Sequence, residues 1–368
     1  MHIKISKASL SEALNNVQSV VGKASIPVLN NVKVSAKDGK VEFTCSDLDI
    51  TLLARSDCDV IEEGETTIPV KTLSSAVSKV VDCTIDINVN QTTDKATISA
   101  GNTVFKFVGL SAKEFPSAPS ADGKGATVSS AAIREMLRKT SFAVCQDETR
   151  RILQSVMIDF DEGFGNVKAV ATDGRRLAVL EGNIEGAKGF KGQYLLPRKA
   201  VDILLKKLPK DGDCTIVTSK SQIFFKTDKI DFMMKLVDDV FPNYTQVIPK
   251  EDGTCITIDR VALIGAIDRI SVFTSLMTEA PCVALSFGDN KCALTSGDTE
   301  FGAANDEVSV KYDSENLTMR FNPQYIKDVL NVIDEDEIEF YITQPTKPAV
   351  IRKGGSKDYT YVVMPLRT

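Results

Sequence analysis

The sequence predicts an α+β protein made of three copies of one unit, each with two helices and antiparallel strands. Three observations predict this fold class. Helix-like segments recur along the 368 residues at nearly constant spacing, alternating strand-like stretches lie between them, and Pro, Gly and Asp turn signals separate the stretches. A fixed internal period is typical of repeated domains, and helices together with antiparallel strands in one unit are typical of α+β domains.

The first helix of each unit is marked by apolar residues four positions apart. Leu10, Ile133 and Leu263 begin this pattern in the three units and stand 123 and 130 residues apart. Apolar residues at this spacing form one face of an amphipathic helix. We therefore expect helices over 7–23, 130–146 and 259–275.

The second helix of each unit follows a proline or a polar cap. Pro69, Pro197 and Asn322 precede these segments or open them, and proline suits the first positions of a helix. We expect helices over 71–82, 198–210 and 323–332.

Two further landmarks repeat, and both belong to strand-like regions. One is an aspartate after an apolar run, at Asp47, Asp173 and Asp298. The other is an apolar series spaced by 126 residues, at Leu110, Leu236 and Val362. Alternating stretches predict half-buried strands over 32–35, 84–89, 215–217 and 338–342. Joints rich in proline, glycine and polar residues place three domains at 1–120, 127–250 and 252–368.

Positive charge is concentrated in the predicted helices. The whole chain has a net charge of −6, yet the six helical segments hold 15 Lys and Arg against 7 Asp and Glu. If the repeats form an arc, equivalent helices make a curved basic wall that complements a phosphate backbone. Such contacts act through counterion release and do not read base sequence. The fourth helix is the richest, with Arg198, Lys199, Lys206, Lys207 and Lys210.

Composition argues against several classes of enzyme and against a membrane protein. The only histidine is His2, tryptophan is absent, and no nucleotide-binding or zinc-protease motif is present, so no cofactor is expected. The eight cysteines are scattered without C-x-x-C and are expected to be small buried hydrophobic residues. No apolar run approaches a membrane span, and the N-terminus lacks the apolar stretch of a signal peptide, so we expect a cytosolic protein.

Three segments carry a resemblance to a known family. They are 171–178 (ATDGRRLA), 241–244 (FPNY) and 362–367 (VVMPLR). Each is similar to a signature of the bacterial DNA polymerase III β subunit, the replication sliding clamp. Considered alone, the first predicts a hairpin with two exposed arginines, the second a turn at a domain edge, and the third a last strand that Pro365 ends.

The resemblance implies a non-catalytic ring that slides on DNA. Two chains would associate head to tail, six domains would close the ring, and twelve helices would line a hole for duplex DNA, which is physically reasonable for head-to-tail contacts that close. A clamp loader would open the ring. The DNA polymerase III catalytic subunit, the clamp loader, other polymerases and repair proteins would bind through short linear motifs.

The resemblance also implies a peptide-binding pocket between the second and third domains. The pocket residues carried over are Leu153, Thr172, Gly174, Arg175, Arg176, Leu177, Pro242, Val247, Asn322, Tyr325, Val362, Val363, Met364, Pro365 and Leu366. Arg175 and Gln246 depart from the residues expected in the best-known members, which leaves the charge of the rim and the peptide preference open. The chain ends in Arg367-Thr368, where a terminal leucine is common in the family.

Two more sets of residues follow from the resemblance and the charge pattern. The resemblance points to DNA contacts at Lys23, Lys71, Gln146 and Arg151, and the charge pattern alone adds Lys199, Lys206 and Lys207. The contact between subunits would bring Phe105 and Phe107 of one chain near Val272 and Phe273 of the other. Burial of these four residues in their own core is the competing interpretation.

Two alternatives to a clamp remain open at this point. The carboxylates of Asp47, Asp49, Asp173 and Asp298 would suit a Mg²⁺-dependent enzyme. Equivalent aspartates of three units would lie far apart, however, and aspartates after strands are more simply turn formers. The second alternative is a peptide-binding scaffold that does not bind DNA.

Overall fold

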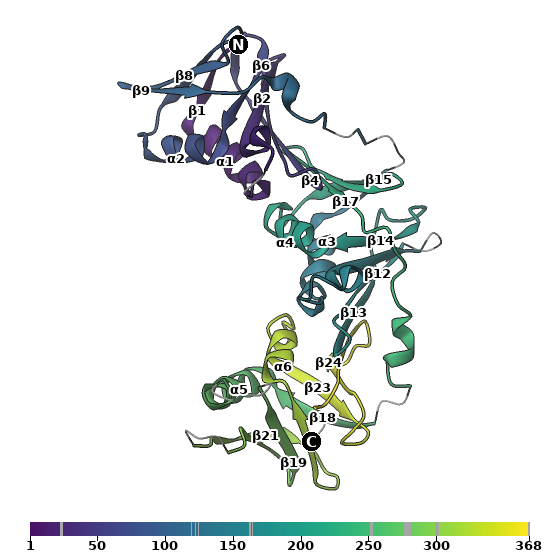
Figure 1. Ribbon diagram of the computed structural model, residues 1–368. Helices are drawn as coiled ribbons and strands as arrows, with labels where there is room; N and C mark the ends of the chain where they lie inside the picture. The colour runs from purple at the N-terminus through teal and green to yellow at the C-terminus, as the bar shows by residue number, and fades with distance from the viewer. Residues whose placement is uncertain are drawn as a thin grey trace. The chain divides into compact units, whose positions relative to one another are not determined.

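The computed structural model describes residues 1–22, 25–118, 120–121, 123, 125–161, 163, 165–250, 253–275, 281–298 and 302–366 (Figure 1). The chain divides into two compact units. Unit 1 consists of residues 1–131 and 199–236, and unit 2 of residues 132–198 and 237–368. The central third of the chain is therefore shared between the two units. Every strand pair is antiparallel and helices are few, so the predicted α+β class is confirmed.

Unit 1 holds helices α1 (Lys7–Val17), α2 (Val70–Lys79) and nearly all of α4 (Arg198–Lys207). Its five-stranded sheet has the order β5-β1-β7-β8-β9, with β1 His2–Ser6, β5 Asp59–Glu62, β7 Thr84–Asn90, β8 Lys95–Ala100 and β9 Thr103–Val108. Its eight-stranded sheet has the order β10-β15-β16-β17-β4-β3-β2-β6. These strands are β2 Asn31–Lys37, β3 Lys40–Ser46, β4 Ile50–Asp57, β6 Gly64–Pro69, β10 Gly125–Ser129, β15 Asp213–Thr218, β16 Gln222–Lys226 and β17 Ile230–Lys235.

Unit 2 holds most of α3 (Ser130–Arg138), α5 (Arg260–Thr274) and α6 (Pro323–Leu330). Its twelve strands form one sheet in the order β14-β11-β12-β13-β25-β24-β23-β18-β21-β20-β19-β22. They are β11 Ser155–Phe160, β12 Asn166–Thr172, β13 Arg176–Asn183, β14 Gly192–Pro197, β18 Thr254–Asp259, β19 Val283–Gly288, β20 Lys291–Thr295, β21 Asn305–Lys311, β22 Leu317–Phe321, β23 Glu337–Ile342, β24 Ala349–Lys353 and β25 Tyr359–Val363.

Short 3₁₀ helices connect these elements. They are η1 Gln18–Val20, η2 Pro27–Asn30, η3 Ala112–Glu114, η4 Ser141–Ala143, η5 Arg151–Gln154 and η6 Tyr244–Val247.

Helices α1, α5 and α6 begin within one residue of the predicted start, and a polar side chain caps each of them. Ser6 accepts from the N–H of Ser9 in α1, Asp259 accepts from Ala262 in α5, and Asn322 accepts from Gln324 in α6. Each cap satisfies a backbone donor that the first turn would otherwise leave without a partner. In α6 Pro323 follows the cap directly, at a position that needs no N–H donor.

All six predicted helices run past the observed ends, and two of them by more than one helical turn. The segment 130–146 is helical only to Arg138, and 7–23 is α-helical only to Val17 before η1. In the first case Thr140 leaves helical geometry (φ −124°) and its hydroxyl donates to the Met136 carbonyl, 2.7 Å away. A hydroxyl that bonds back to the preceding turn competes with the helix ladder, so an apolar period alone did not reveal the end.

Strand pairing joins consecutive thirds of the chain in two equivalent places. Met233 of β17 pairs with Thr51 of β4, and Val362 of β25 pairs with Leu177 of β13. The pairing therefore equates Met233 with Val362. The predicted equivalence of Leu236 with Val362 is wrong by three residues. A constant spacing cannot detect a loop whose length differs between the second and the last third of the chain.

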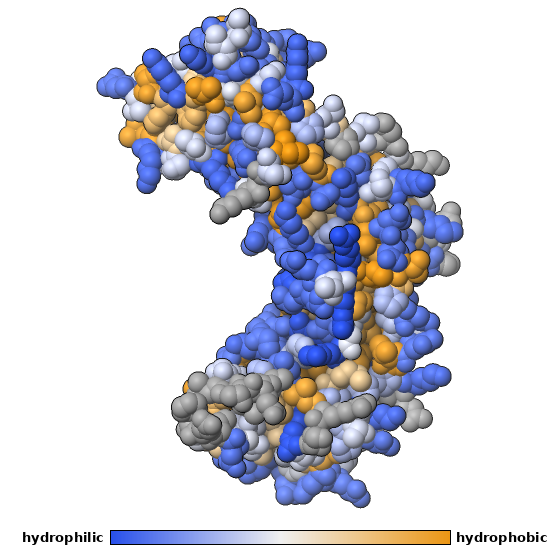
Figure 2. Space-filling view, viewed as in Figure 1, coloured by the Kyte–Doolittle hydropathy of each residue, from blue (hydrophilic) through white to orange (hydrophobic). Residues whose placement is uncertain are grey.

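The strand equivalent to β17 and β25 in the first third is β9, and it lies at a sheet edge. Among the described residues β9 pairs only with β8, and it exposes Val104 (55%) and Val108 (70%). Figure 2 shows hydrophobic residues gathered at the end of unit 1 where Figure 1 places β9. A long apolar edge strand is a template for pairing with another chain.

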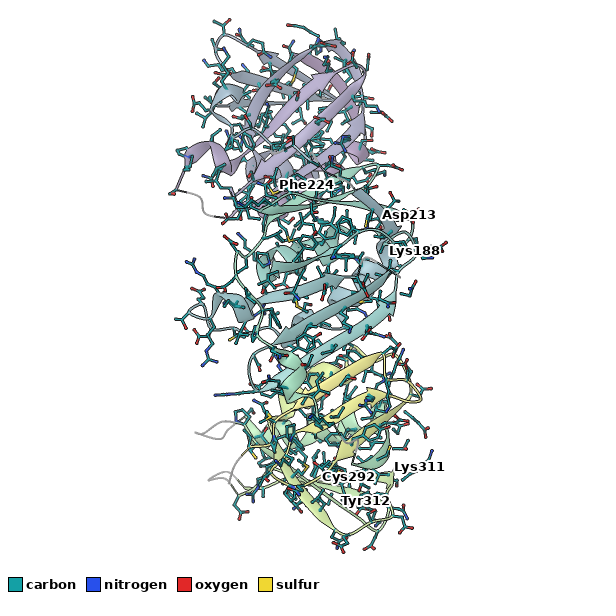
Figure 3. All side chains as sticks on the ribbon, turned by 90° about the vertical axis from the view of Figure 1, so that its right-hand side faces the viewer. Lys188, Asp213, Phe224, Cys292, Lys311 and Tyr312 are labelled. Atoms are coloured by element: carbon teal, nitrogen blue, oxygen red, sulfur yellow. The ribbon has the colours of Figure 1, made fainter. Side chains whose placement is uncertain are left out.

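The cysteines differ in how deeply they are buried. Cys45, Cys145, Cys214 and Cys292 are buried as predicted, Cys58, Cys83 and Cys282 are half-buried, and Cys255 is exposed. Figure 3 labels Cys292 in β20 and Phe224 in β16, which are fully enclosed side chains of the two units.

Iodoacetamide at pH 8 is expected to alkylate Cys255 well before Cys214 and Cys292. Burial raises the pKa of Cys214 to about 11 and that of Cys292 to about 12, so both remain thiols, which are poor nucleophiles. Peptide mass spectrometry after timed labelling measures the order, and labelling in urea gives the control in which all eight react. Equal rates for Cys292 and Cys255 in the folded protein would contradict the burial.

None of the described helices combines the length and the apolar character that crossing a membrane requires.

Candidate functional site

The segment 172–176 forms the predicted hairpin turn between β12 and β13. Asp173 Oδ1 accepts from the N–H groups of Arg175 (2.8 Å) and Arg176 (3.0 Å), and Gly174 has φ +86°. Thr172 Oγ1 accepts from Gly174 N–H and donates to the Arg176 carbonyl. A left-handed residue is required at the tip, and glycine adopts that conformation without strain.

Asp47 makes the same turn in the first third of the chain. Its Oδ1 accepts from the N–H groups of Asp49 (3.0 Å) and Ile50 (2.7 Å). Asp47 and Asp173 therefore form turns. This is the simpler interpretation that the sequence offered in place of a Mg²⁺ site. Over the described part of the chain, no three Asp, Glu, His or Cys side chains lie together as metal ligands would.

One face of the large sheet in unit 2 packs a continuous cluster of apolar side chains, which we call the apolar patch. Cross-strand pairs build it: Leu177 with Val362, Val362 with Val350, and Val170 with Met157. Its buried members are Met157, Val170, Leu177, Val179, Leu195, Phe241, Val350 and Val362. Its half-buried members are Ile152, Val237, Tyr244, Ile248 and Tyr341.

The connector between the second and third thirds of the chain crosses this patch. Phe241 is buried in it, while Tyr244 and Ile248 pack against it from η6 and the residue that follows. Val247 on the same helix is 51% exposed. The connector thus covers part of the patch and places an apolar side chain beside it. Tyr244 belongs to the segment 241–244 singled out in the sequence, but Tyr244, Ile248 and Ile152 were not among the predicted pocket residues, because no signal in the sequence shows which sheet face the connector covers.

The predicted pocket residues separate onto the two faces of the sheet. Leu177 and Val362 face the apolar patch, whereas Arg176 pairs with Val363 in the register that faces the helices. Neighbouring residues of a strand point to opposite faces, so a contiguous stretch of sequence cannot line one surface. The expectation of two exposed arginines in the hairpin is wrong for Arg176, which is 6% exposed.

Arg176 is held by four groups on the helix side. Its guanidinium donates to Asp173 (3.0 Å), Asp328 (2.5 Å) and the Phe142 carbonyl (2.8 Å), and its Cζ lies 4.4 Å from the ring centroid of Tyr325. The carboxylates supply the counter-charge that a buried guanidinium needs. Arg176 therefore links the β12–β13 turn to α6 and fixes the ring of Tyr325.

The C-terminal segment continues past β25 along the same turn. Met364 N–H donates to the Arg175 carbonyl (2.9 Å), and Leu366 N–H donates to the Arg320 carbonyl in β22 (2.7 Å). Met364 remains 42% exposed, and Pro365 lies between the two bonds. The turn, the last strand and α6 thus meet at one end of the sheet. Leu153 and Pro242 lie on η5 and the connector, which also border this region.

The residues predicted to contact DNA have different surroundings. Lys71 and Lys206 are exposed, as are Gln146 and Arg151. Lys199 forms an ion pair with Asp47, and Lys207 donates to the Asn15 carbonyl. Burial, and then the charge of Lys206, lower the pKa of Lys207. Lys199 and Lys207 therefore attach α4 to the first third of the chain, and Lys23 lies outside the described residues.

The residues predicted at the subunit contact lie beside open strand edges. Phe105 and Phe107 belong to β9, and Val272 on α5 is 61% exposed. Phe273 lies near Gly302, just before β21, and Arg269 of α5 pairs with Asp306 of β21 at 2.5 Å. Phe107 is 9% exposed and belongs to the buried core of its own unit, so the competing interpretation holds for that residue.

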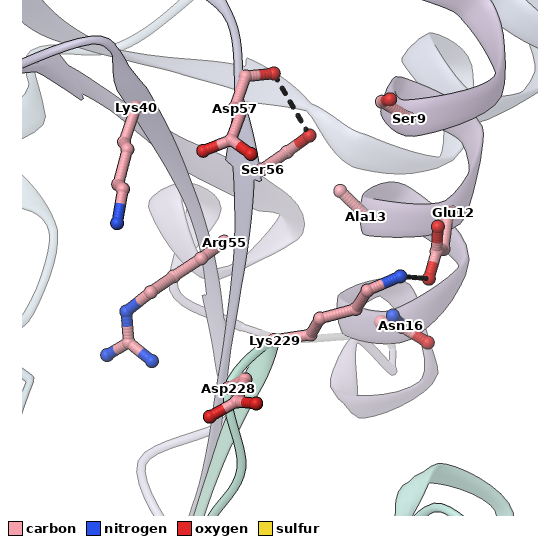
Figure 4. Close-up of a pocket in the computed structure, with 10 residues that line it drawn as sticks. All are labelled: Ser9, Glu12, Ala13, Asn16, Lys40, Arg55, Ser56, Asp57, Asp228 and Lys229. Atoms are coloured by element: carbon pink, nitrogen blue, oxygen red, sulfur yellow. Dashed lines mark hydrogen bonds and ion pairs between the residues drawn. The ribbon is translucent and has the colours of Figure 1, made fainter.

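Unit 1 also contains a polar cavity of 380 Å³ that the sequence did not indicate. It lies between α1, β4 and the turn before β17, and Figure 4 shows Lys229 reaching Glu12 at 2.9 Å across it. At its floor Arg55 binds Asp231 through two hydrogen bonds of 2.9 and 2.7 Å. These ion pairs fasten the first third of the chain to β17.

Known proteins match this chain along its whole length. Family models of the DNA polymerase III beta subunit match it with the N-terminal domain at 1–119, the central domain at 127–243 and the C-terminal domain at 245–367. A beta sliding clamp of Pseudomonas aeruginosa is 30% identical over 372 residues and covers 100% of both chains. One of Caulobacter vibrioides is 30% identical over 375 residues, again with 100% of both chains covered.

Solved structures give the same result. The DNA polymerase sliding clamp from Bacillus subtilis matches with a TM-score of 0.94 at 26% identity, and covers 100% of this chain and 99% of its own. A Pseudomonas aeruginosa sliding clamp bound to griselimycin matches with a TM-score of 0.93 at 29% identity, with 100% of both chains covered.

Proposed function

Because this chain belongs to the DNA polymerase III beta subunit family and is a DNA sliding clamp, we propose that it closes into a ring around duplex DNA. The family is a non-catalytic accessory subunit of the polymerase holoenzyme. A Mg²⁺-dependent enzyme is not favoured, because two of the three equivalent aspartates are engaged in turns. We further propose how the ring closes, which residues contact DNA, and where partner proteins bind.

Ring closure is inferred from two strand edges, those of β9 and β21, that lack a partner strand among the described residues. Within the chain, β17 pairs with β4 and β25 pairs with β13, so each third joins the next through equivalent strands. By the same repeat, β9 is the equivalent strand of the first third, and among the described residues it pairs only with β8. At the other end β21, which follows the third aspartate landmark, pairs with β18 only at Val310 and Lys311 among the described residues.

Pairing of β9 with residues 305–309 of a second copy repeats the internal junction. The contact is heterologous, since it joins two different surfaces, and such contacts generate rings when the rotation closes. Val104 and Val108 on β9 and Val272 on α5 supply exposed apolar area for it. A head-to-tail homodimer with three domains per chain, divided near 120 and 250, is the closed form that we propose.

DNA is held by exposed cations on helices, without base contacts. Lys71 at the start of α2 and Lys206 near the end of α4 are the best candidates in unit 1, and Arg151 is the candidate in unit 2. Contacts to phosphates let the ring move along the duplex, because every base step offers the same backbone charge. A contact to one base sequence would hold the clamp at that site.

Changing Lys71 or Lys206 to Glu is expected to weaken binding to a labelled duplex several-fold at low salt. Each change removes one phosphate contact, so the slope of log affinity against log salt falls by about 1. Fluorescence anisotropy over a salt series measures both quantities. Lys220→Glu, an exposed position in the turn before β16, is the control with the same charge change. Equal losses in all three variants would contradict a localised DNA surface.

Partner proteins bind at the end of the large sheet in unit 2. The exposed Met364 and Val247, together with the half-buried members of the apolar patch, offer anchor sites for aliphatic or aromatic side chains of short motifs. We propose the polymerase III catalytic subunit, the clamp loader, other polymerases and repair proteins as the carriers of these motifs. A replication clamp acts at the chromosome, so the proposal places the protein in the cytoplasm, associated with the nucleoid.

A further inference from the structure

We propose that Asp47 lowers the affinity of this clamp for DNA, because it holds the ammonium group of Lys199 in an ion pair that a DNA phosphate must break. The inference rests on the proposed DNA surface and adds a residue that weakens the grip of that surface. It assigns to Asp47 a role beyond the turn that this residue forms.

Lys199 lies on the face of α4 that carries the proposed DNA contact Lys206. Both side chains are exposed, and the exposed Asp202 lies between them on the same face. Residues three, four and seven positions apart share one face of a helix, and seven residues span about 10 Å. The opposite face of α4 is buried against the protein. A phosphate backbone that runs along the exposed face therefore meets both lysines.

The ammonium group of Lys199 already has a partner in the protein without DNA. It donates to Asp47 Oδ2 and forms an ion pair with this carboxylate. The side chain of Lys199 is 65% exposed and that of Asp47 is 18% exposed. The pair thus lies at the surface, where a phosphate can approach the lysine while the aspartate stays fixed in its turn.

The equivalent turn of the second third shows why Asp47 is available for this pair. In both turns Oδ1 of the aspartate accepts from two backbone N–H groups. Oδ2 of Asp173 accepts from Arg176 of its own turn, at 3.0 Å. The strand pairing places Ile50 where the second turn has Arg176. The first turn therefore supplies no cation of its own, and Oδ2 of Asp47 binds Lys199 from α4.

Exchange of a carboxylate for a phosphate gives the lysine little net binding. A lysine that neutralises a DNA phosphate releases a condensed counterion, and this release drives association. When Lys199 leaves Asp47, the carboxylate takes up a cation from solution, so that the total release is close to zero. Lys199 therefore adds little to the affinity while Asp47 is charged. A grip limited in this way suits a ring that must move along the duplex.

The test is the affinity of the full-length protein for a fluorescein-labelled duplex, measured by fluorescence anisotropy over a salt series. Asp47→Asn is expected to bind about 3-fold tighter at low salt, because it frees an exposed lysine from its ion pair. The slope of log affinity against log salt is expected to become steeper by about 1, since one more counterion is released.

Two substitutions of Asp47 protect the test against loss of the turn. Asparagine keeps an Oδ1 acceptor for the backbone N–H groups, and serine offers a hydroxyl oxygen that accepts in turns of this kind. Asp47→Ser is therefore expected to tighten DNA binding as Asp47→Asn does. Circular dichroism of both variants checks that the fold is retained.

Asp49→Asn is the matched control. It removes the same charge from the same turn, but Asp49 pairs with Lys235 at the end of β17, 3.1 Å away, and not with a lysine of α4. Its affinity for the duplex is expected to stay close to the wild-type value, because salt screens charges that lie away from the DNA. Lys199→Gln added to Asp47→Asn is expected to remove the gain and to return the affinity to that of the control.

Each outcome decides the inference. Equal changes in Asp47→Asn and Asp49→Asn, or a gain that persists when Lys199→Gln is added, overturns the role of Asp47 and leaves the DNA surface intact. Unchanged affinity in the folded Asp47→Asn and Asp47→Ser variants overturns that role as well. Absence of duplex binding by the wild-type chain and by every variant overturns the proposed DNA surface together with the role of Asp47.

Discussion

Arg176→Ala is expected to lower the free energy of unfolding of unit 2 by about 3 kcal/mol and to abolish peptide binding. Removal of the guanidinium leaves the carboxylates of Asp173 and Asp328 half-buried without a cation, and the loss of one partner from a buried pair is costly. It also removes the group that lies over the Tyr325 ring and the donor that binds the Phe142 carbonyl. Urea unfolding followed by circular dichroism measures the stability.

The peptide measurement distinguishes positioning from direct contact. Arg176 makes three hydrogen bonds within the protein, so we expect it to act by holding the β12–β13 turn against α6. Arg176→Lys keeps the charge but not the fork of donors, and is expected to recover part of the stability and part of the binding. Arg320→Ala removes an exposed arginine in β22 and serves as the control, with a change within about 0.5 kcal/mol. Full peptide affinity in Arg176→Ala would contradict the positioning role.

Val108→Lys and Val272→Asp are each expected to convert the proposed dimer into monomers at micromolar concentration. Both side chains are largely exposed in the single chain, at 70% and 61%, so the fold itself does not depend on them. A charge placed in an apolar contact between subunits loses its water shell without gaining a partner. Light scattering after gel filtration measures the change from about 80 to 40.0 kDa.

Mixing the two variants tests the head-to-tail geometry. One contact of the mixed dimer then carries both substitutions, while the other has wild-type β9 against wild-type α5. The mixture is therefore expected to dimerise although each variant alone does not. A head-to-head dimer through β9 would instead leave Val272→Asp dimeric. Val240→Lys, a 79% exposed valine on the connector, is the control and should remain dimeric.

Much of the local structure was predictable because its causes lie within a few residues. The alternating stretch 84–89 is strand β7, and the Asp-Gly turn at 173–174 is a hairpin whose aspartate binds its own following N–H groups. The starts of α1, α5 and α6 were predicted to within one residue because each cap lies next to the helix that it serves. Part of the candidate site was predictable for the same reason, since the hairpin and the last strand each carry their own turn or stop signal.

Other parts of the site depend on partners that are distant in sequence. Arg175 and Arg176 are adjacent and chemically identical, yet one is exposed and the other is buried against Asp328, 152 residues away. Lys199 is predicted as a DNA contact from charge alone, and in the fold its exposed ammonium group pairs with Asp47 of the first third. Charge in a sequence does not reveal its counter-charge, because ion pairs form through space after the strands have paired.

The sequence by itself determined that this protein has three repeated α+β units, where most helices begin, and which turns connect its strands. These features follow from short-range periodicity, capping and turn chemistry. Only the tertiary structure decided that the central third divides between two compact units, which face of the sheet each pocket residue occupies, and that β9 and β21 keep open edges. Those features depend on the register of strands far apart in the chain, and a shift of one residue in register moves every side chain to the opposite face.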